Sequence, residues 1–67
     1  GGISDNDIKI FVTATTVSFN WSTITTEFSV SVSLNDSSYH IPKKKGFFVW
    51  SNLTPATLYT FKLIFEQ

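Results

Sequence analysis

The side chains that could carry out acid–base or metal chemistry are few in this 67-residue chain, and they lie far apart in the sequence. General acid–base catalysis needs titratable groups placed within hydrogen-bonding reach of a substrate, but the five carboxylates are scattered over predicted turns and termini. There is one histidine, His40, and no cysteine, so a zinc site would have a single imidazole and no thiolate. We therefore predict no catalytic residue, no metal site, no cofactor and no enzyme activity. We interpret His40 as a surface residue beside a turn.

The sequence indicates covalent modification more strongly than it indicates catalysis or metal binding. Three of the four asparagines stand in N-x-Ser/Thr acceptor triplets, namely Asn20-Trp21-Ser22, Asn35-Asp36-Ser37 and Asn52-Leu53-Thr54. Because 18 of the 67 residues are Ser or Thr, three such triplets would arise by chance only about one time in fifteen to twenty. A glycan must reach solvent, so Asn35 in a predicted turn and Asn52 at a predicted corner rank first. Asn20 faces outward but precedes a bulky tryptophan, and it ranks third.

An apolar strand near the middle of the chain supplies a candidate contact surface. Phe47 and Val49 alternate with Phe48 and Trp50, and alternate residues of a strand point to opposite faces. If Phe48 and Trp50 face the core, then Phe47 and Val49 form an exposed apolar patch of the kind that marks contact surfaces. Cover by the N-terminal segment or by a neighbouring domain is the alternative explanation of this patch.

Three consecutive lysines, Lys43, Lys44 and Lys45, form a second candidate contact surface. They could meet an anionic partner such as heparan sulfate or lipid headgroups. A solvated turn that discourages edge aggregation explains them equally well. All five basic residues of the chain are lysines, and the absence of arginine argues against a nucleic-acid partner because Arg supplies the planar fork that reads phosphates and base edges.

The periodicity of the chain predicts strands and no helix. Apolar residues recur at every second position, which is the period of a half-buried strand, in the segments 8–12, 17–22, 28–34, 39–41, 47–50 and 59–65. Clusters of Thr, Ser, Asn, Asp, Lys or Gly between them predict turns, notably at 13–16, 35–38 and 43–46. No apolar run approaches the roughly 20 residues that span a bilayer. We predict a single all-β domain over 1–67, made of two packed antiparallel sheets, with residues 1–7 flexible.

The turn before the last predicted strand carries a family resemblance. It reads Asn52-Leu53-Thr54-Pro55-Ala56-Thr57-Leu58-Tyr59, with Pro55 to start the turn and Tyr59 placed to pin it to the sheet. It resembles the tyrosine corner of β-sandwich domains. It also resembles the sequence motif of fibronectin type III domains, whose equivalent segment typically reads Leu-x-Pro-Gly-Thr-x-Tyr. The strand that ends near Trp21 also resembles the second strand of that family.

The resemblance covers roughly residues 8–66 and implies a fibronectin type III-like, immunoglobulin-like antiparallel β-sandwich. It implies structural roles for Trp21, Leu53, Pro55 and Tyr59, with Trp21 packing near Pro55. Two features depart from the family. The corner has Asn52 and Ala56 where the family often has glycine; Asn tolerates positive φ, and Ala56 predicts a corner that needs no positive φ there.

The second departure is that the chain stops at Gln67, after the sixth strand, whereas the family has a seventh. Either the sequence was cut short, or the domain is truncated, or another segment supplies that strand. The last case leaves the edge of the sixth strand open for pairing.

The expected function follows from the resemblance and the acceptor triplets. Such modules resemble those in the ectodomains of animal cell-surface receptors, among which receptor-type tyrosine phosphatases and adhesion receptors fit the Leu-Tyr-Thr-Phe after the corner. We expect an extracellular module that acts in adhesion and spacing. Its partners would be neighbouring domains or an extracellular protein, with no nucleic acid and no direct membrane insertion. Two alternatives stay open: a linker module of a secreted carbohydrate-active enzyme, and an assembly subunit completed by a partner strand.

Overall fold

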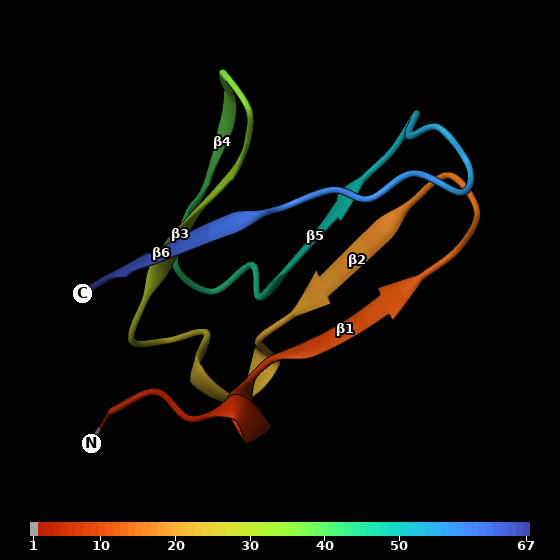
Figure 1. Ribbon diagram of the computed structural model, residues 1–67. Coiled ribbons are helices and arrows are strands. Elements are labelled where there is room, and N and C mark those ends of the chain that lie inside the picture. The colour runs from red at the N-terminus through yellow and green to blue at the C-terminus, as the bar shows by residue number, and fades with distance from the viewer. Residues whose placement is uncertain (1) are drawn as a thin grey trace.

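The computed structural model describes residues 2–67 and consists of strands joined by turns (Figure 1). Besides two 3-10 turns, η1 (Asp5–Asp7) and η2 (Ser22–Ile24), the elements are β1 (Lys9–Val12), β2 (Val17–Asn20), β3 (Ser29–Leu34), β4 (Ser37–Ile41), β5 (Phe47–Trp50) and β6 (Lys62–Glu66). They form two antiparallel three-stranded sheets with the orders β1-β2-β5 and β4-β3-β6. This confirms the all-β antiparallel class and is consistent with a small β-sandwich. The flexibility predicted for residues 1–7 stays a prediction, and Gly1 lies outside the described residues.

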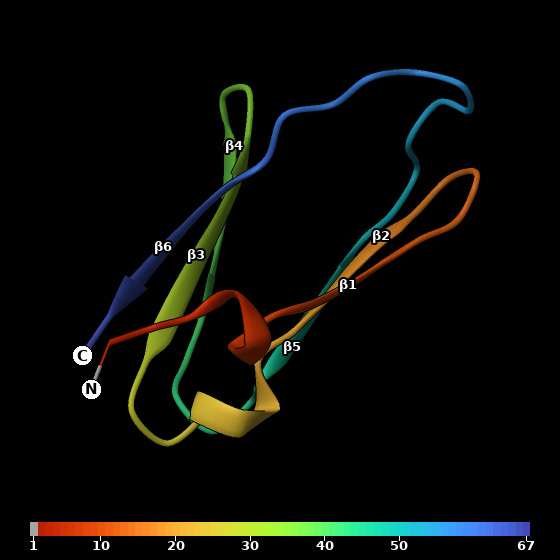
Figure 2. The ribbon, with the colours of Figure 1, turned by 60° about the horizontal axis from the view of Figure 1, so that its bottom comes forward.

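The two sheets form separate layers, and the chain passes between them at both ends (Figure 2). Aromatic side chains join the layers. Tyr39 of β4 meets Phe48 and Trp50 of β5, with ring centroids 5.2 and 5.0 Å apart. Trp21, just after β2, meets the edge of Phe65 on β6 at 6.4 Å. Thus β5 lies over β4, and the end of β2 lies over β6.

The core follows the alternation of the strands. On β3, Val30, Val32 and Leu34 are buried while the serines between them are only half-buried. On β2, Phe19 is buried and Val17 is half-buried. Each fully buried aliphatic or aromatic side chain stabilises the fold by about 1.5–3 kcal/mol, so this small set carries much of the stability. The buried cluster comprises Phe19, Trp21, Val30, Val32 and Ile41.

The starts of β4 and β6 differ from the predicted ones because the β3–β4 hairpin sets them. The turn predicted at 35–38 is shorter, since Leu34 already pairs with Ser37 and Asn35 takes a positive φ of 54°, which a two-residue hairpin turn requires. The last strand, predicted from Tyr59, begins at Lys62. Because β3 ends at this hairpin, its ladder with β6 stops at the pair of Ser33 with Lys62.

The prediction that Trp21 packs near Pro55 is wrong. The N–H of Trp21 donates to the Gly46 carbonyl at 2.8 Å, beyond the end of β2. The corner instead sits at the start of β2, where the N–H of Leu53 donates to the Thr15 carbonyl at 2.9 Å. Because β2 and β5 run antiparallel, these contacts lie at opposite ends of β2. Trp21 is nonetheless fully buried, as a core anchor must be.

Candidate functional site

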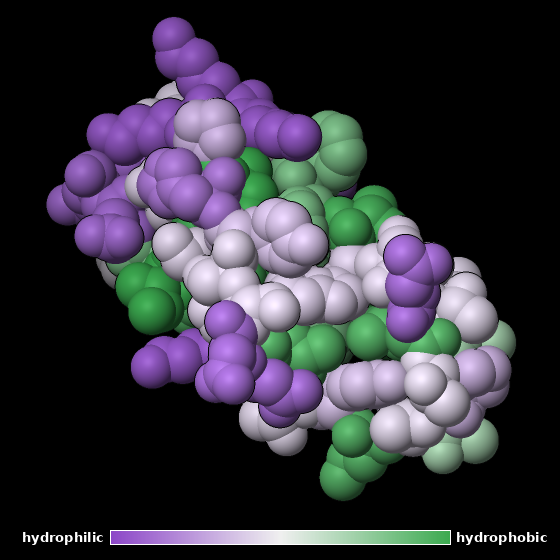
Figure 3. All heavy atoms as spheres, turned by 90° about the horizontal axis from the view of Figure 1, so that it is seen from above, coloured by the Kyte–Doolittle hydropathy of each residue, from purple (hydrophilic) through white to green (hydrophobic). Residues whose placement is uncertain are grey.

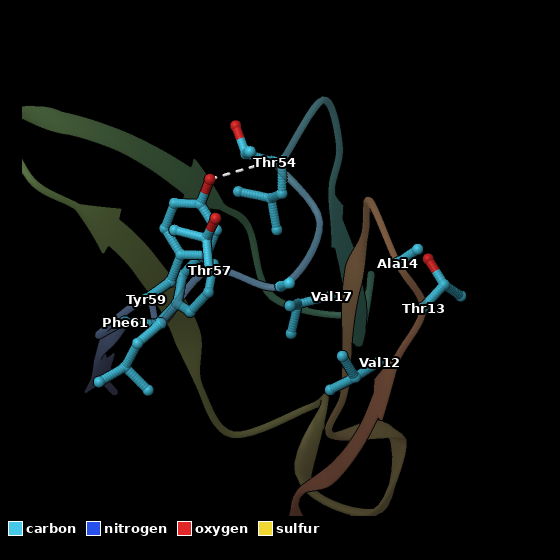
Figure 4. Close-up of a pocket in the computed structure, with 11 residues that line it drawn as sticks. Val12, Thr13, Ala14, Val17, Thr54, Thr57, Tyr59 and Phe61 are labelled. Atoms are coloured by element: carbon cyan, nitrogen blue, oxygen red, sulfur yellow. Dashed lines mark hydrogen bonds between the residues drawn. The ribbon is translucent and has the colours of Figure 1, made fainter.

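The corner before β6 is held by a tyrosine hydrogen bond. The N–H of Thr54 donates to the Tyr59 phenol oxygen at 2.8 Å (Figure 4), and the Thr57 hydroxyl donates to the Pro55 carbonyl at 3.1 Å. Hydrogen bonding from the Thr54 side chain and from its N–H lowers the pKa of Tyr59 below its ordinary value. Tyr59 therefore ties the segment that leads into β6 back to the turn five residues earlier.

The backbone of the corner is left-handed at two positions. Asn52 has φ 62° and Ala56 has φ 54°. The expectation that Ala56 needs no positive φ is therefore wrong. Ala56 carries a Cβ, which costs roughly 1–2 kcal/mol in this region, and the Tyr59 hydrogen bond closes the corner around it.

A cavity opens between this corner and the turn that joins β1 to β2. Its volume is about 460 Å³. In Figure 4, Val12, Thr13 and Ala14 stand on one side, and residues of the corner stand on the other. Among residues 2–67, no lysine, histidine or carboxylate lines it; its apolar walls come from Val12, Val17, Leu53, Leu58 and Phe61. Such a cavity suits apolar side chains.

The inner face of β1 is uncovered. Ile10 pairs with the buried Phe19, and Val12 pairs with the half-buried Val17, and directly paired residues lie on the same face of a sheet. Ile10 and Val12 therefore point inward, yet they are 58% and 72% exposed. Since the end of β2 already lies over β6, β1 extends past β6, and no strand among residues 2–67 covers it.

Among residues 2–67, the outer edge of β6 is unpaired and lies on the same side of the molecule as the exposed inner face of β1. β6 pairs with β3 alone within the described residues, so half of the N–H and C=O groups of Lys62–Glu66 point away from β3 without a strand partner. We call this edge, the inner face of β1 (Ile10 and Val12) and the adjoining cavity the open side. An extended segment placed there would gain main-chain hydrogen bonds and cover exposed apolar side chains.

The outer faces of the two sheets differ in polarity. On β1-β2-β5, Phe11, Phe47 and Val49 are 66%, 50% and 45% exposed, and the ladder places Phe11 and Val49 on either side of Ser18. We call these three side chains the outer apolar face. On β4-β3-β6, Ile64 is the apolar exception on a face that otherwise bears polar residues, among them Ser31, Ser33, Ser38, His40, Lys62 and Glu66. Viewed from above, hydrophobic side chains reach the surface between polar ones (Figure 3).

Sequence reasoning found two of the three members of the outer apolar face. Phe47 and Val49 point outward, as the alternation on β5 predicts. Phe11 was missed because β1 is apolar on both faces, so hydropathy gives no orientation for it. The signal that would find it is the strand register. Whether this face makes contacts stays a prediction.

The lysine turn lies just before the start of β5, next to this face. Lys43, Lys44 and Lys45 are exposed, and Lys44 has a φ of 77°. The Nζ of Lys45 lies 5.4 Å from the centre of the Phe47 ring, within the range of a cation–π contact. The two predicted contact surfaces are therefore adjacent.

The three acceptor asparagines occupy different settings. Asn35 and Asn52 are exposed, the first in the β3–β4 hairpin and the second at the corner. Asn20 is half-buried at the end of β2, where it stands between Lys9 and Phe47 in the ladder. Its Oδ1 accepts the N–H of Ser22 at 3.0 Å.

Acid–base groups do not converge anywhere in the described chain. His40 is exposed on the outer face of β4, paired with Ser31. Asp7 is used locally, where its Oδ2 accepts the N–H of Ser4 at 2.9 Å. Within residues 2–67, no three His, Asp or Glu side chains gather as metal ligands would.

In the part of the chain that the structure describes, no helix has the length and apolar character needed to cross a membrane. No protein-family model, no curated protein and no solved structure matches the sequence or the fold.

Proposed function

We propose that this chain is a fibronectin type III-like module in the ectodomain of an animal cell-surface receptor, where it binds protein and spaces neighbouring domains without catalysis of its own. The observation that carries the proposal is the open side, where an unpaired strand edge borders apolar side chains that face inward but remain exposed. Support for the family comes from the Tyr59–Thr54 hydrogen bond and from the buried Trp21. Both are features that the family resemblance implies.

The open side suits an extended polypeptide better than any small substrate. A strand that pairs with β6 would take up the free N–H and C=O groups of that edge, which supplies affinity independent of sequence. Every second side chain would point toward Ile10, Val12 and the cavity, while the others would lie on the polar outer face beside Lys62 and Glu66. The ligand is therefore an extended segment with alternating apolar and polar residues.

A peptide titration tests this proposal. The probe is a synthetic peptide with the sequence Thr-Lys-Val-Thr-Val-Glu-Thr, added to isotope-labelled protein while amide hydrogen exchange is followed by NMR. We expect slower exchange at the β6 amides that point away from β3. Losing the burial of one valine, which is worth about 1.5–3 kcal/mol, should weaken binding by roughly tenfold or more, so Val12→Asp should have that effect.

The matched control is Val49→Asp. Val49 is an exposed strand valine like Val12, but it lies on the outer face of β5. We expect this variant to bind the peptide as the parent chain does. Equal loss in both variants, or no protection at β6 in the parent chain, would refute binding at the open side.

The same observation favours a second candidate, an assembly subunit completed by a strand from another chain. In that case the partner strand would be part of the folded unit, and the complex would not exchange with free peptide. A longer piece of the parent protein that stays monomeric, and in which the β6 amides are protected, would exclude strand exchange. A dimer or higher oligomer with the same protection would favour it.

A further inference from the structure

We infer that Asn20 carries an N-linked glycan that covers the outer apolar face of the β1-β2-β5 sheet. The inference rests on the extracellular placement in the proposed function, because N-glycosylation of Asn-x-Ser/Thr is a modification of secreted and surface chains. It reverses the ranking expected from the sequence, which put Asn20 behind Asn35 and Asn52. Three observations support it.

The first observation is the position of Asn20 on the sheet. It lies on the central strand, paired with Lys9 of β1 on one side and Phe47 of β5 on the other. Phe11 and Val49 belong to the row two residues along. Directly opposed residues have Cβ atoms about 4.5–5.5 Å apart and diagonal ones about 7–8 Å, so the first sugar on Asn20 would lie within reach of the whole outer apolar face.

The second observation is the setting of the carboxamide. The Ser22 N–H holds Oδ1 at 3.0 Å, which orients the group, and among residues 2–67 the amide nitrogen Nδ2 makes no hydrogen bond. Trp21 does not shield it, because the Trp21 side chain is fully buried and packs against Phe65 on the inner side. The bulk that lowered the rank of this triplet therefore lies on the other face of the strand.

The third observation is the surface itself. Phe11, Phe47 and Val49 are each 45–66% exposed on one face, and no segment of residues 2–67 covers them. The apolar C–H faces of a sugar can pack on such rings, with Lys45 on Phe47 as the neighbouring cation. Asn35 offers no comparable support, because it sits at a hairpin tip beside Asp36 and Ser37.

The modification is a glycosyl transfer by the secretory machinery and not by this chain. It forms a bond between Nδ2 and the anomeric carbon of the first sugar, breaks the bond from that carbon to the phosphate oxygen of a lipid-linked glycosyl diphosphate, and releases the lipid diphosphate and one Nδ2 proton. The donor is thus a glycosyl diphosphate, and the acceptor keeps its Oδ1.

The test uses the chain secreted from animal cells behind a cleavable secretion signal, with intact mass measured before and after enzymatic glycan removal. Ser22→Ala destroys the acceptor triplet but keeps the backbone N–H of residue 22. Ser22→Thr keeps both the triplet and that N–H. We expect Ser22→Ala to lose one glycan mass and Ser22→Thr to retain it. If Ser22→Ala is not secreted, peptide mapping of the parent chain locates the glycan directly, and an unmodified Asn20 there overturns the inference.

The covering role has its own readout. Enzymatic removal of the glycans should lower the melting temperature of the parent chain by several degrees, and by the same amount in Asn35→Gln, which keeps the Asn20 glycan. In Phe47→Ser the drop should shrink. An unchanged melting temperature in the parent chain would overturn the covering role. Glycans on Asn35 or Asn52 alone would refute this inference and leave the open side untouched, whereas failed peptide binding with Asn20 occupied would refute the proposed function instead.

Discussion

Replacing Tyr59 with phenylalanine removes one oxygen atom and keeps the ring, so it isolates the hydrogen bond that closes the corner. That oxygen accepts the Thr54 N–H at 2.8 Å. A typical intramolecular hydrogen bond contributes about 0.5–1.5 kcal/mol net, whereas a buried donor left unsatisfied costs about 1–3 kcal/mol. Thr54 is exposed, so water can bind its N–H in the variant. We therefore expect Tyr59→Phe to lower the free energy of unfolding by about 1 kcal/mol.

Thermal unfolding followed by circular dichroism measures this loss. For a domain of 60–100 residues, 1 kcal/mol corresponds to a change in melting temperature of about 4–8 °C. The matched control is Tyr39→Phe, since the Tyr39 hydroxyl makes no hydrogen bond within residues 2–67 and its ring stays against Phe48 and Trp50. We expect almost no change there. An unaltered melting temperature for Tyr59→Phe, or an equal loss for Tyr39→Phe, would refute a stabilising tyrosine corner.

Three further predictions concern the left-handed residues Ala56 and Gly46 and the phenol of Tyr59. Ala56→Gly removes a left-handed strain of roughly 1–2 kcal/mol and adds an entropy cost of about 0.5–1 kcal/mol, so the urea midpoint should rise slightly; a fall would contradict this. Gly46→Ala should cost at least about 1–2 kcal/mol, because φ is 75° and the new Cβ would lie 3.0 Å from the Thr25 hydroxyl; an unchanged midpoint would disprove it. Folding lowers the pKa of Tyr59. The free energy of unfolding should therefore increase as the pH rises through the folded-state pKa, and the increase should be complete above the unfolded-state value of about 10. Urea titrations at alkaline pH should show this increase in the parent chain and not in Tyr59→Phe.

Strand positions were predictable where alternating or apolar residues lie between turn residues. β5 has the predicted bounds, Phe47–Trp50, and β3 shows the predicted burial of alternate residues. The start of β6 was harder to place, because the length of its ladder depends on where β3 turns back at Asn35 and not on the residues of β6 itself. The place of Trp21 relative to Pro55 likewise depends on strand pairing.

The candidate surfaces divide in the same way. Outward orientation of Phe47 and Val49 follows from a period of two, but the third member, Phe11, appears only when the register pairs it with Ser18. The exposed inner face of β1 could not be predicted at all. Ile10 and Val12 read as core residues in the sequence, and their exposure results from the absence of an opposing strand among residues 2–67.

The sequence by itself determined the all-β class, the positions of the turns, the acceptor triplets and the scarcity of groups for catalysis. These properties are local, because side-chain alternation, turn composition and motif spacing act over a few residues. Tertiary structure alone decided the open side and the outer apolar face around Asn20. Each of these depends on which strands pair and on how one sheet packs over the other. Such contacts join residues far apart in the sequence, so the residue pattern of a single strand does not predict them.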